Sequence, residues 1–206
     1  MTEMIKAIIF DFGNVLVHFD PDYILSENFP LGEDRRLLAP IVFSRSYWDK
    51  TDDGSMSEEQ VYETISPTLD KKYCDGVRHT LMNWHRRLPE WEGMRELICS
   101  LKDRGYPIFV ISNISKRFAE HSNEVPILSL ADNALYSAEV GETKPSAEIF
   151  RLACEKFGYK KEDCVFIDDS PKNVQGAREF GMNAILFDGD IGSLSRSLDE
   201  LIKVNK

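Results

Sequence analysis

The sequence has few cysteines and no long apolar run. Its cysteines number four, and they form no Cys-x-x-Cys pair and no other spacing typical of zinc ligands. No run of about 18 apolar residues occurs, and the apolar run near the start reaches Asp11 before it is long enough for a signal-peptide core. We therefore expect a cytoplasmic protein with reduced, buried thiols and no membrane partner.

Positive charge is also scarce. The 206 residues include 25 Lys and Arg against 35 Asp and Glu, which gives a formal net charge of −10. No segment concentrates basic side chains enough to attract a phosphate backbone against this charge, so nucleic acid is excluded as a primary partner. An anionic small substrate would need a local cation, a metal ion or a cradle of backbone N–H groups.

Short apolar runs that alternate with amphipathic segments are present instead. With 42% hydrophobic and 29% charged residues, the composition is that of a globular protein, and the length predicts one domain, with or without an insertion. The runs are too short for helices and apolar throughout, as strands buried on both faces of a parallel sheet are. The predicted strands are Ala7–Phe10, Ile108–Ile111, Cys164–Ile167 and Ala184–Phe187, with Ala134–Val140 as a weaker candidate.

Helical periodicity and capping residues mark the segments between the strands. Glycines end three of these helices, and a serine followed by proline begins one of them. The predicted helices are Met94–Leu101 with a stop at Gly105, Ile149–Phe157 with a stop at Gly158, Ser170–Gly181, and Leu194–Val204.

The region 19–89 has a different character, because it contains no clear strand and its apolar residues fall at helical spacings. Prolines at 21, 30, 40 and 67 are expected to divide it into short helices. The predicted fold class is therefore α/β: a Rossmann-like parallel sheet formed by residues 1–18 and 90–206, with an all-helical subdomain inserted at residues 19–89.

Three of the predicted strands end in polar residues. Asp11 follows the first strand, Ser112-Asn113 ends the second, and Asp168-Asp169 ends the strand that begins at Cys164. Open α/β sheets bind ligands at the carboxyl ends of their strands, so we expect these side chains to converge. A further motif, Lys144-Pro145, lies between Ser112-Asn113 and Asp168-Asp169 in the chain, just before a predicted helix.

Such a cluster suggests phosphoryl transfer. Three converging carboxylates repel one another unless a divalent cation lies between them, and hard oxygen ligands favour Mg²⁺. The metal ion, Lys144 and Ser112 would bind a phosphoryl group while Asp11 attacks phosphorus, which forms an aspartyl-phosphate that water then hydrolyses. Metal and lysine would supply the local positive charge that the chain as a whole lacks.

In this order the four motifs resemble those of the haloacid dehalogenase superfamily, over residues 4 to about 188. The helical insertion resembles the cap of that superfamily. The segments Phe10–Val15 and Asp52–Ser57 resemble its sugar-phosphate phosphatase branch, which includes α-D-glucose-1-phosphate phosphatase.

The resemblance implies a role for each motif residue. Asp11 would be nucleophile and Mg²⁺ ligand, and Asp169 a direct ligand. Asp168 would act through water or as a neighbour of the ligands, Gly13 would offer its carbonyl oxygen, and Asn173 would orient this group. Ser112 and Asn113 would bind the phosphoryl group, and Lys144 would neutralise it together with the nucleophile.

Gly13 is a departure from the family pattern. The usual first motif has a second aspartate at this position, which protonates the leaving oxygen and deprotonates the attacking water. Acid–base catalysis is typically worth about 10²–10⁴-fold in rate, so its absence predicts a slower enzyme or one restricted to good leaving groups. Some relatives that resemble α-D-glucose-1-phosphate phosphatase share this glycine and are nonetheless phosphatases, so the resemblance favours an active enzyme. His18 and Asp20 are candidate substitutes.

The favoured hypothesis is a Mg²⁺-dependent phosphatase, monomeric or homodimeric, that hydrolyses a small phosphorylated metabolite such as a sugar phosphate. One alternative is a 2-haloacid dehalogenase, in which Asp11 would attack carbon without a metal ion. The other is a non-catalytic phosphometabolite-binding protein, which Gly13 suggests. Trp48 and Trp84 are expected to be core aromatics, with a role in the substrate pocket left open.

Overall fold

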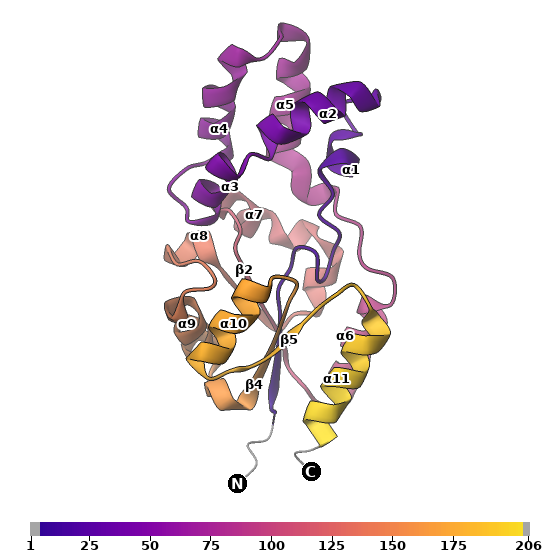
Figure 1. Cartoon of the computed structure of the whole chain (residues 1–206), viewed down its shortest axis with the longest axis vertical. Coiled ribbons are helices and arrows are strands. Elements are labelled where there is room, and N and C mark those ends of the chain that lie inside the picture. Colours follow the sequence, from indigo (N-terminus) through magenta and orange to yellow (C-terminus); the bar gives the residue numbers. More distant parts are fainter. Residues whose placement is uncertain (1–4, 204–206) are drawn as a thin grey trace.

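The computed structural model describes residues 5–203, which form a parallel five-stranded sheet beneath a layer of helices (Figure 1). The strands lie in the order β3-β2-β1-β4-β5. Their bounds are β1 Ala7–Phe10, β2 Ile108–Ser112, β3 Asn133–Tyr136, β4 Cys164–Asp168 and β5 Asn183–Leu186. The prediction of a Rossmann-like α/β fold is thereby confirmed.

The weaker strand candidate was right in its first half only. β3 ends at Tyr136, and the helix α8 (Ser137–Val140) follows at once and stops at Gly141 in the left-handed conformation. The chain leaves the sheet here because β3 pairs with β2 only as far as Ser112, where β2 itself ends.

Both faces of the sheet are buried, and alternate residues of each strand point to different helices. On one face, Ile8 and Phe10 of β1 pack with α6 (Met94–Asp103) and α11 (Ile191–Lys203). On the other, Ala7 and Ile9 pack with α9 (Ala147–Phe157) and α10 (Pro171–Phe180). Burial on both faces explains why the strands have continuous apolar sequences.

The predicted core helices are present. α9 ends at Gly158 with φ +77°, α10 begins at Pro171 and ends at Gly181, and the turn at Gly105 follows α6. The last helix begins three residues before its predicted start, and the final residue of that prediction, Val204, lies outside the described residues.

The segment between β1 and α6 is helical and stands above the carboxyl ends of the strands (Figure 1). Most of its apolar side chains form a cluster of their own. Pro40 does not divide two helices as expected: it lies inside α2, two residues from its end, and the helix continues past it although the proline nitrogen cannot donate to the carbonyl four residues earlier. The elements are α1 Pro21–Leu25, α2 Gly32–Val42, α3 Arg45–Asp52, α4 Glu58–Ile65, η1 Ser66–Thr68, α5 Lys71–Asn83 and η2 Trp84–Arg86.

Polar contacts join this helical layer to the core beside the strand ends. Ser137 Oγ donates to the carbonyl oxygen of Asp52 at 2.5 Å, and Ser115 Oγ donates to Glu58 Oε1 at 2.5 Å. The remaining short helices of the core are α7 Lys116–His121, η3 Ser122–Glu124, η4 Pro126–Leu130 and η5 Lys161–Asp163.

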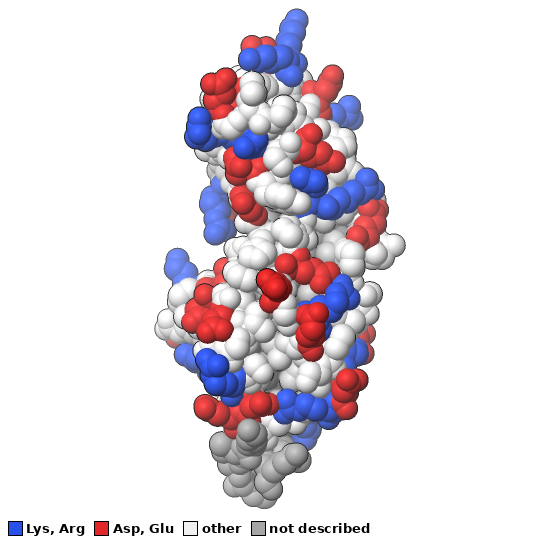
Figure 2. Space-filling model, turned by 90° about the vertical axis from the view of Figure 1, so that its right-hand side faces the viewer, with Lys and Arg blue, Asp and Glu red and all other residues white. Residues whose placement is uncertain are grey.

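On the face drawn in Figure 2, basic side chains are scattered among acidic ones and form no continuous patch. None of the helices described is long and apolar enough to cross a membrane.

The four cysteines are free thiols, but only Cys164 is buried, and the expectation of burial was wrong for Cys99, which is exposed.

Candidate active site

The chain runs from β1 outward through β2 and β3, then returns to the other side of β1 to form β4 and β5. The point where the direction reverses lies between β1 and β4, and ligands of open α/β sheets bind at such points. Asp11 comes directly after β1, and its N–H donates to the carbonyl oxygen of Ile167 in β4 at 2.8 Å. The pairing places Asp11 beside Asp168, as the sequence predicts.

Lys144 lies between these two carboxylates. Its Nζ is 2.7 Å from Asp11 Oδ1 and 2.7 Å from Asp168 Oδ2, and its side chain is buried. Asn113, after β2, holds the lysine backbone in place: its Oδ1 accepts from Lys144 N at 2.7 Å and its Nδ2 donates to Lys144 O at 3.0 Å. The two separate motifs of the sequence thus form one unit in which Asn113 positions Lys144.

Asp168 is fully buried, and both of its oxygens accept hydrogen bonds. Oδ1 accepts from Ser170 N at 2.8 Å, and Asn173 Nδ2 donates to both oxygens at 3.1 Å. Because Lys144 also binds Oδ2, the carboxylate is held in one orientation from three sides. The neighbouring Asp169 is partly exposed and lines the cavity described below.

Burial and mutual repulsion control the titration of this cluster. Burial raises the pKa of Asp11 to about 7, although the ammonium of Lys144 opposes the shift. Burial, followed by the charge of Asp168, also raises the pKa of Asp169. Burial disfavours the charged form of Lys144, but Asp11 and Asp168 outweigh it and hold the lysine pKa above its usual value. Gathering these carboxylates is therefore unfavourable in the absence of further positive charge.

The carboxylates can hold a divalent cation. Oxygen atoms of Asp11, Asp168 and Asp169 all lie within 4.8 Å of one another. A set of hard oxygen donors that repel one another matches the preference of Mg²⁺, which needs only one or two carboxylates and keeps several waters. Gly13 lies in the same wall of the site, so the residues present fit the metal ion that the sequence predicts.

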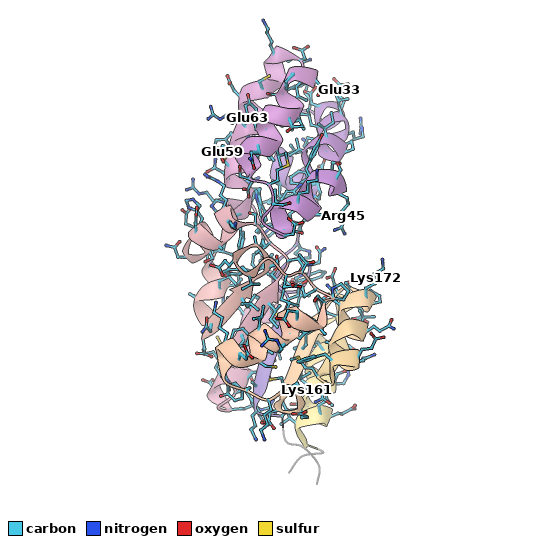
Figure 3. All side chains as sticks on the ribbon, turned by 90° about the vertical axis from the view of Figure 1, so that its left-hand side faces the viewer. Glu33, Arg45, Glu59, Glu63, Lys161 and Lys172 are labelled. Atoms are coloured by element: carbon cyan, nitrogen blue, oxygen red, sulfur yellow. The ribbon has the colours of Figure 1, made fainter. Side chains whose placement is uncertain are left out.

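A cavity of about 890 Å³ lies above these residues, between the strand ends and the helical layer. Its floor includes the motif residues Asp11, Gly13, Ser112, Asn113 and Lys144. Arg45 of α3 and Lys172 of α10 both line the cavity. In Figure 3, Arg45 lies at the lower end of the helical layer and Lys172 lies at the upper end of the core. The helical layer contributes Phe19, Phe43, Arg45, Trp48, Asp49, Asp52, Asp53 and Trp84.

Four aromatic rings form one wall. Trp48 lies 5.0 Å from Trp84 and 5.4 Å from Phe43, measured between ring centroids, and Phe19 contacts all three. Both tryptophans therefore have a place in the pocket as well as in packing.

Acidic residues of α3 were not among the predicted site residues, although Asp52 was noted as part of a motif. Asp52 is the last residue of α3, lines the cavity and is held by the hydrogen bond from Ser137. Burial raises its pKa well above the usual value, and the charge of Asp49 adds to the shift, while Arg45 and Lys144 oppose it. Sequence patterns gave no sign of this environment because it arises from contacts between distant elements.

The predicted substitutes for the missing acid–base residue lie elsewhere. His18 stacks on Trp91 with ring centroids 3.7 Å apart, and Asp20 caps α1 by accepting from Asp22 N and Tyr23 N. Neither residue belongs to the wall of the cavity.

Fold and site together define an α/β protein that gathers carboxylates and a buried lysine at the carboxyl edge of a parallel sheet, beneath a helical layer. The sequence profile of the haloacid dehalogenase-like hydrolases matches residues 5–181. The chain belongs to this hydrolase family.

Curated relatives differ in how much of their length this chain covers. A drimenol cyclase of Aspergillus calidoustus is 28% identical over 188 residues, which are 89% of this chain but 34% of the cyclase. A D-ribitol-5-phosphate phosphatase of Bacteroides thetaiotaomicron is 25% identical over 188 residues, which are 86% of this chain and 89% of the phosphatase. The chain thus spans about a third of the first relative and most of the second.

Solved structures share the fold. A haloacid dehalogenase-family enzyme of Bacteroides thetaiotaomicron, in complex with magnesium and inorganic phosphate, matches with a TM-score of 0.66 at 19% identity, over 92% of this chain and 98% of that one. A dehalogenase matches with a TM-score of 0.72 at 17% identity, over 91% of this chain and 87% of that one.

Proposed function

We propose that the protein is a Mg²⁺-dependent phosphatase of small phosphorylated metabolites, with Asp11 as the nucleophile. The observation that carries the proposal is the convergence of Asp11, Asp169 and Lys144 on the floor of one cavity, with the buried Asp168 paired to Lys144 beside them. The phosphatase relative and the family structure that binds magnesium and phosphate support it. A cytoplasmic location and a monomer or homodimer remain part of the proposal.

The residues of the chain would share the work as follows. Phe12 N and Lys144 Nζ both bind Oδ1 of Asp11, so Oδ2 is the oxygen that we assign to the attack on phosphorus. The new bond joins Asp11 to phosphorus, and the bond from phosphorus to the leaving oxygen breaks with its electron pair on that oxygen. Water then attacks the aspartyl-phosphate and restores the carboxylate. Lys144 and Ser112 would hold the phosphoryl oxygens.

A metal ion held by Asp11, Asp169 and the Gly13 carbonyl would neutralise charge on the phosphoryl group. Asp168, whose oxygens are engaged by Ser170, Asn173 and Lys144, is assigned the positioning of Lys144 rather than direct ligation.

Asp52 is our candidate for the acid–base role that Gly13 leaves open. It lines the same cavity as Asp11 and Gly13, and its backbone is fixed to the core by Ser137. Its raised pKa favours the protonated carboxyl, which can donate a proton to the leaving oxygen. In the second step the carboxylate would take a proton from the attacking water. The residue belongs to the helical layer, so we propose that residues 19–89 act as a cap that completes the site.

The cavity favours a sugar phosphate as substrate. The rings of Trp48 and Phe43 offer an apolar surface for the C–H face of a sugar, and Asp49 and Asp53 offer acceptors for its hydroxyl groups. The same carboxylates disfavour a second anionic group near them. The volume of about 890 Å³ leaves room for a small metabolite.

The test is a screen of sugar phosphates with and without Mg²⁺, followed by Asp11→Asn. We expect Mg²⁺-dependent release of phosphate that Asp11→Asn abolishes. Hydrolysis that is indifferent to EDTA, or release of halide from 2-haloacids, would favour the dehalogenase chemistry suggested by the similar fold of the dehalogenase. Phosphate-ester binding without turnover across the screen would favour a binding protein.

A further inference from the structure

A second group of metal-binding side chains lies outside the cavity. His85, His121 and Glu124 each offer a ligand atom, and these atoms lie within 4.8 Å of one another. His121 Nδ1 is 2.9 Å from Glu124 Oε1, and His85 Nε2 is 3.5 Å from Glu124 Oε2. The two imidazole rings are nearly parallel, with centroids 5.3 Å apart. None of the three residues lines the cavity above Asp11.

His85 has an unsatisfied nitrogen at this place. Its side chain is 2% exposed, and its Nε2 is buried without a hydrogen-bond partner, because the 3.5 Å approach to Glu124 does not give a hydrogen bond. Nearly all buried polar atoms in folded proteins are paired, so an orphaned nitrogen that faces a carboxylate and a second imidazole calls for an explanation.

The donor set and its spacing suit a transition-metal ion. Zn²⁺ binds imidazole nitrogen and carboxylate oxygen at about 2.0–2.2 Å, so neighbouring ligand atoms of a tetrahedral site lie roughly 3.3–3.6 Å apart. The 3.5 Å between His85 Nε2 and Glu124 Oε2 already meets this spacing, whereas His121 Nδ1 faces the other oxygen, Oε1, so Glu124 would bind through both oxygens or turn one of them toward the ion. His121 and Glu124 would separate by about 0.5 Å to reach it, and their side chains, 33% and 31% exposed, are free enough to move.

We propose that His85, His121 and Glu124 form a Zn²⁺ site, with water as the fourth ligand. His85 belongs to η2 in the helical layer, whereas His121 and Glu124 belong to α7 and η3 of the core. A bound ion therefore links the two layers. The residue before His85 is Trp84, which lines the cavity, so the link is made directly beside the substrate pocket.

Arg86 works against the ion. Its Nε donates to Glu124 Oε2 at 2.7 Å, which adds a positive charge to the carboxylate that the metal needs. A bound ion would share Glu124 with this guanidinium, so Arg86 weakens the site, and Arg86→Gln should strengthen binding of Zn²⁺.

The experiment measures Zn²⁺ binding to the full chain by titration calorimetry after EDTA treatment, with saturating Mg²⁺ present to occupy the aspartate cluster. The wild type should bind one equivalent. His85→Gln and His121→Gln should each weaken binding by at least roughly tenfold, and Arg86→Gln should tighten it. His79→Gln is the matched control, because His79 is an exposed histidine of the helical layer outside the cluster.

NMR gives a second readout that does not depend on the variants. The chain has four histidines, so ring signals can be assigned individually. Zn²⁺ should shift the signals of His85 and His121 and leave those of His18 and His79 unchanged. Equal Zn²⁺ affinity in the wild type and in His121→Gln, or absence of shifts at His85 and His121, would overturn the proposal.

Discussion

At the scale of single residues, the sequence predicted the side chains that lie at the ends of strands. It missed those whose position depends on contacts between elements distant in the chain. Asp11 and Asp168 were found because adjacent parallel strands bring their carboxyl ends to one edge. No comparable rule predicts the position of Asp52, because its environment depends on how α3 lies over the core. His18 was a wrong candidate for the same reason: its place against Trp91 results from packing between distant segments.

The acid role of Asp52 predicts a characteristic pH dependence. Because burial raises the pKa of Asp52, the protonated acid persists above the usual range for aspartate and is lost as the pH rises through that raised pKa. Turnover of alkyl phosphates by the wild type should therefore fall as the pH rises through the raised pKa of Asp52. Asp52→Asn should lose this fall and reduce kcat by about 10²-fold or more for alkyl phosphates. For p-nitrophenyl phosphate, whose leaving group needs no proton, kcat/KM should change little because it reports the first step, whereas loss of the base for the second step lowers kcat for both substrates.

Asp53→Asn serves as the control, because it removes a carboxylate from the next position in the same cavity. A cavity-wide charge effect would change both variants alike and would refute the specific role of Asp52. Gly13→Asp in the Asp52→Asn background offers a rescue, since a Cβ at residue 13 meets nothing within 4 Å.

At the scale of elements, continuous apolar runs identified the strands, because burial on both faces requires them. Junctions were less predictable. Helix α8 was read as part of a strand, and Pro40 was expected to end a helix that continues past it. The contacts that fix the helical layer, such as those of Ser115 with Glu58, join segments far apart in the chain and leave no periodic pattern in the sequence.

The turn after α3 is one of these junctions, and it predicts a cost for Gly54→Ala. Gly54 has φ +76°, and a Cβ there would lie 2.7 Å from the carbonyl oxygen of Ala138. Gly158 has φ +77° but open space around it, so Gly158→Ala shares only the backbone penalty of about 1–2 kcal/mol. Gly54→Ala should lower the unfolding free energy further and reduce kcat, because the turn adjoins Asp52.

Urea unfolding and steady-state kinetics on the two alanine variants separate these effects. If both variants lost the same stability and Gly54→Ala kept its kcat, the close approach of residue 54 to Ala138 would not be what positions the helical layer over the site.

At the scale of the whole molecule, the net charge of −10 includes carboxylates that the fold forces together. The unfolded chain separates them, so folding without a cation works against their repulsion, whereas a cation that binds only the folded state stabilises it. At a Mg²⁺ concentration 100-fold above the dissociation constant, the gain is about 2.7 kcal/mol. The metal site and the stability of the chain are thereby linked.

Asp169→Asn tests this link through stability rather than activity. The pKa of Asp169 is raised by burial and by Asp168, so its ionised form is unfavourable in the folded state at neutral pH. Without Mg²⁺, the variant should therefore melt at a higher temperature than the wild type. With Mg²⁺, the wild type should gain stability and the variant should gain little, since it lacks a ligand. Thermal melts in EDTA and in Mg²⁺ give all four values, and an equal Mg²⁺ effect on both proteins would place the ion elsewhere.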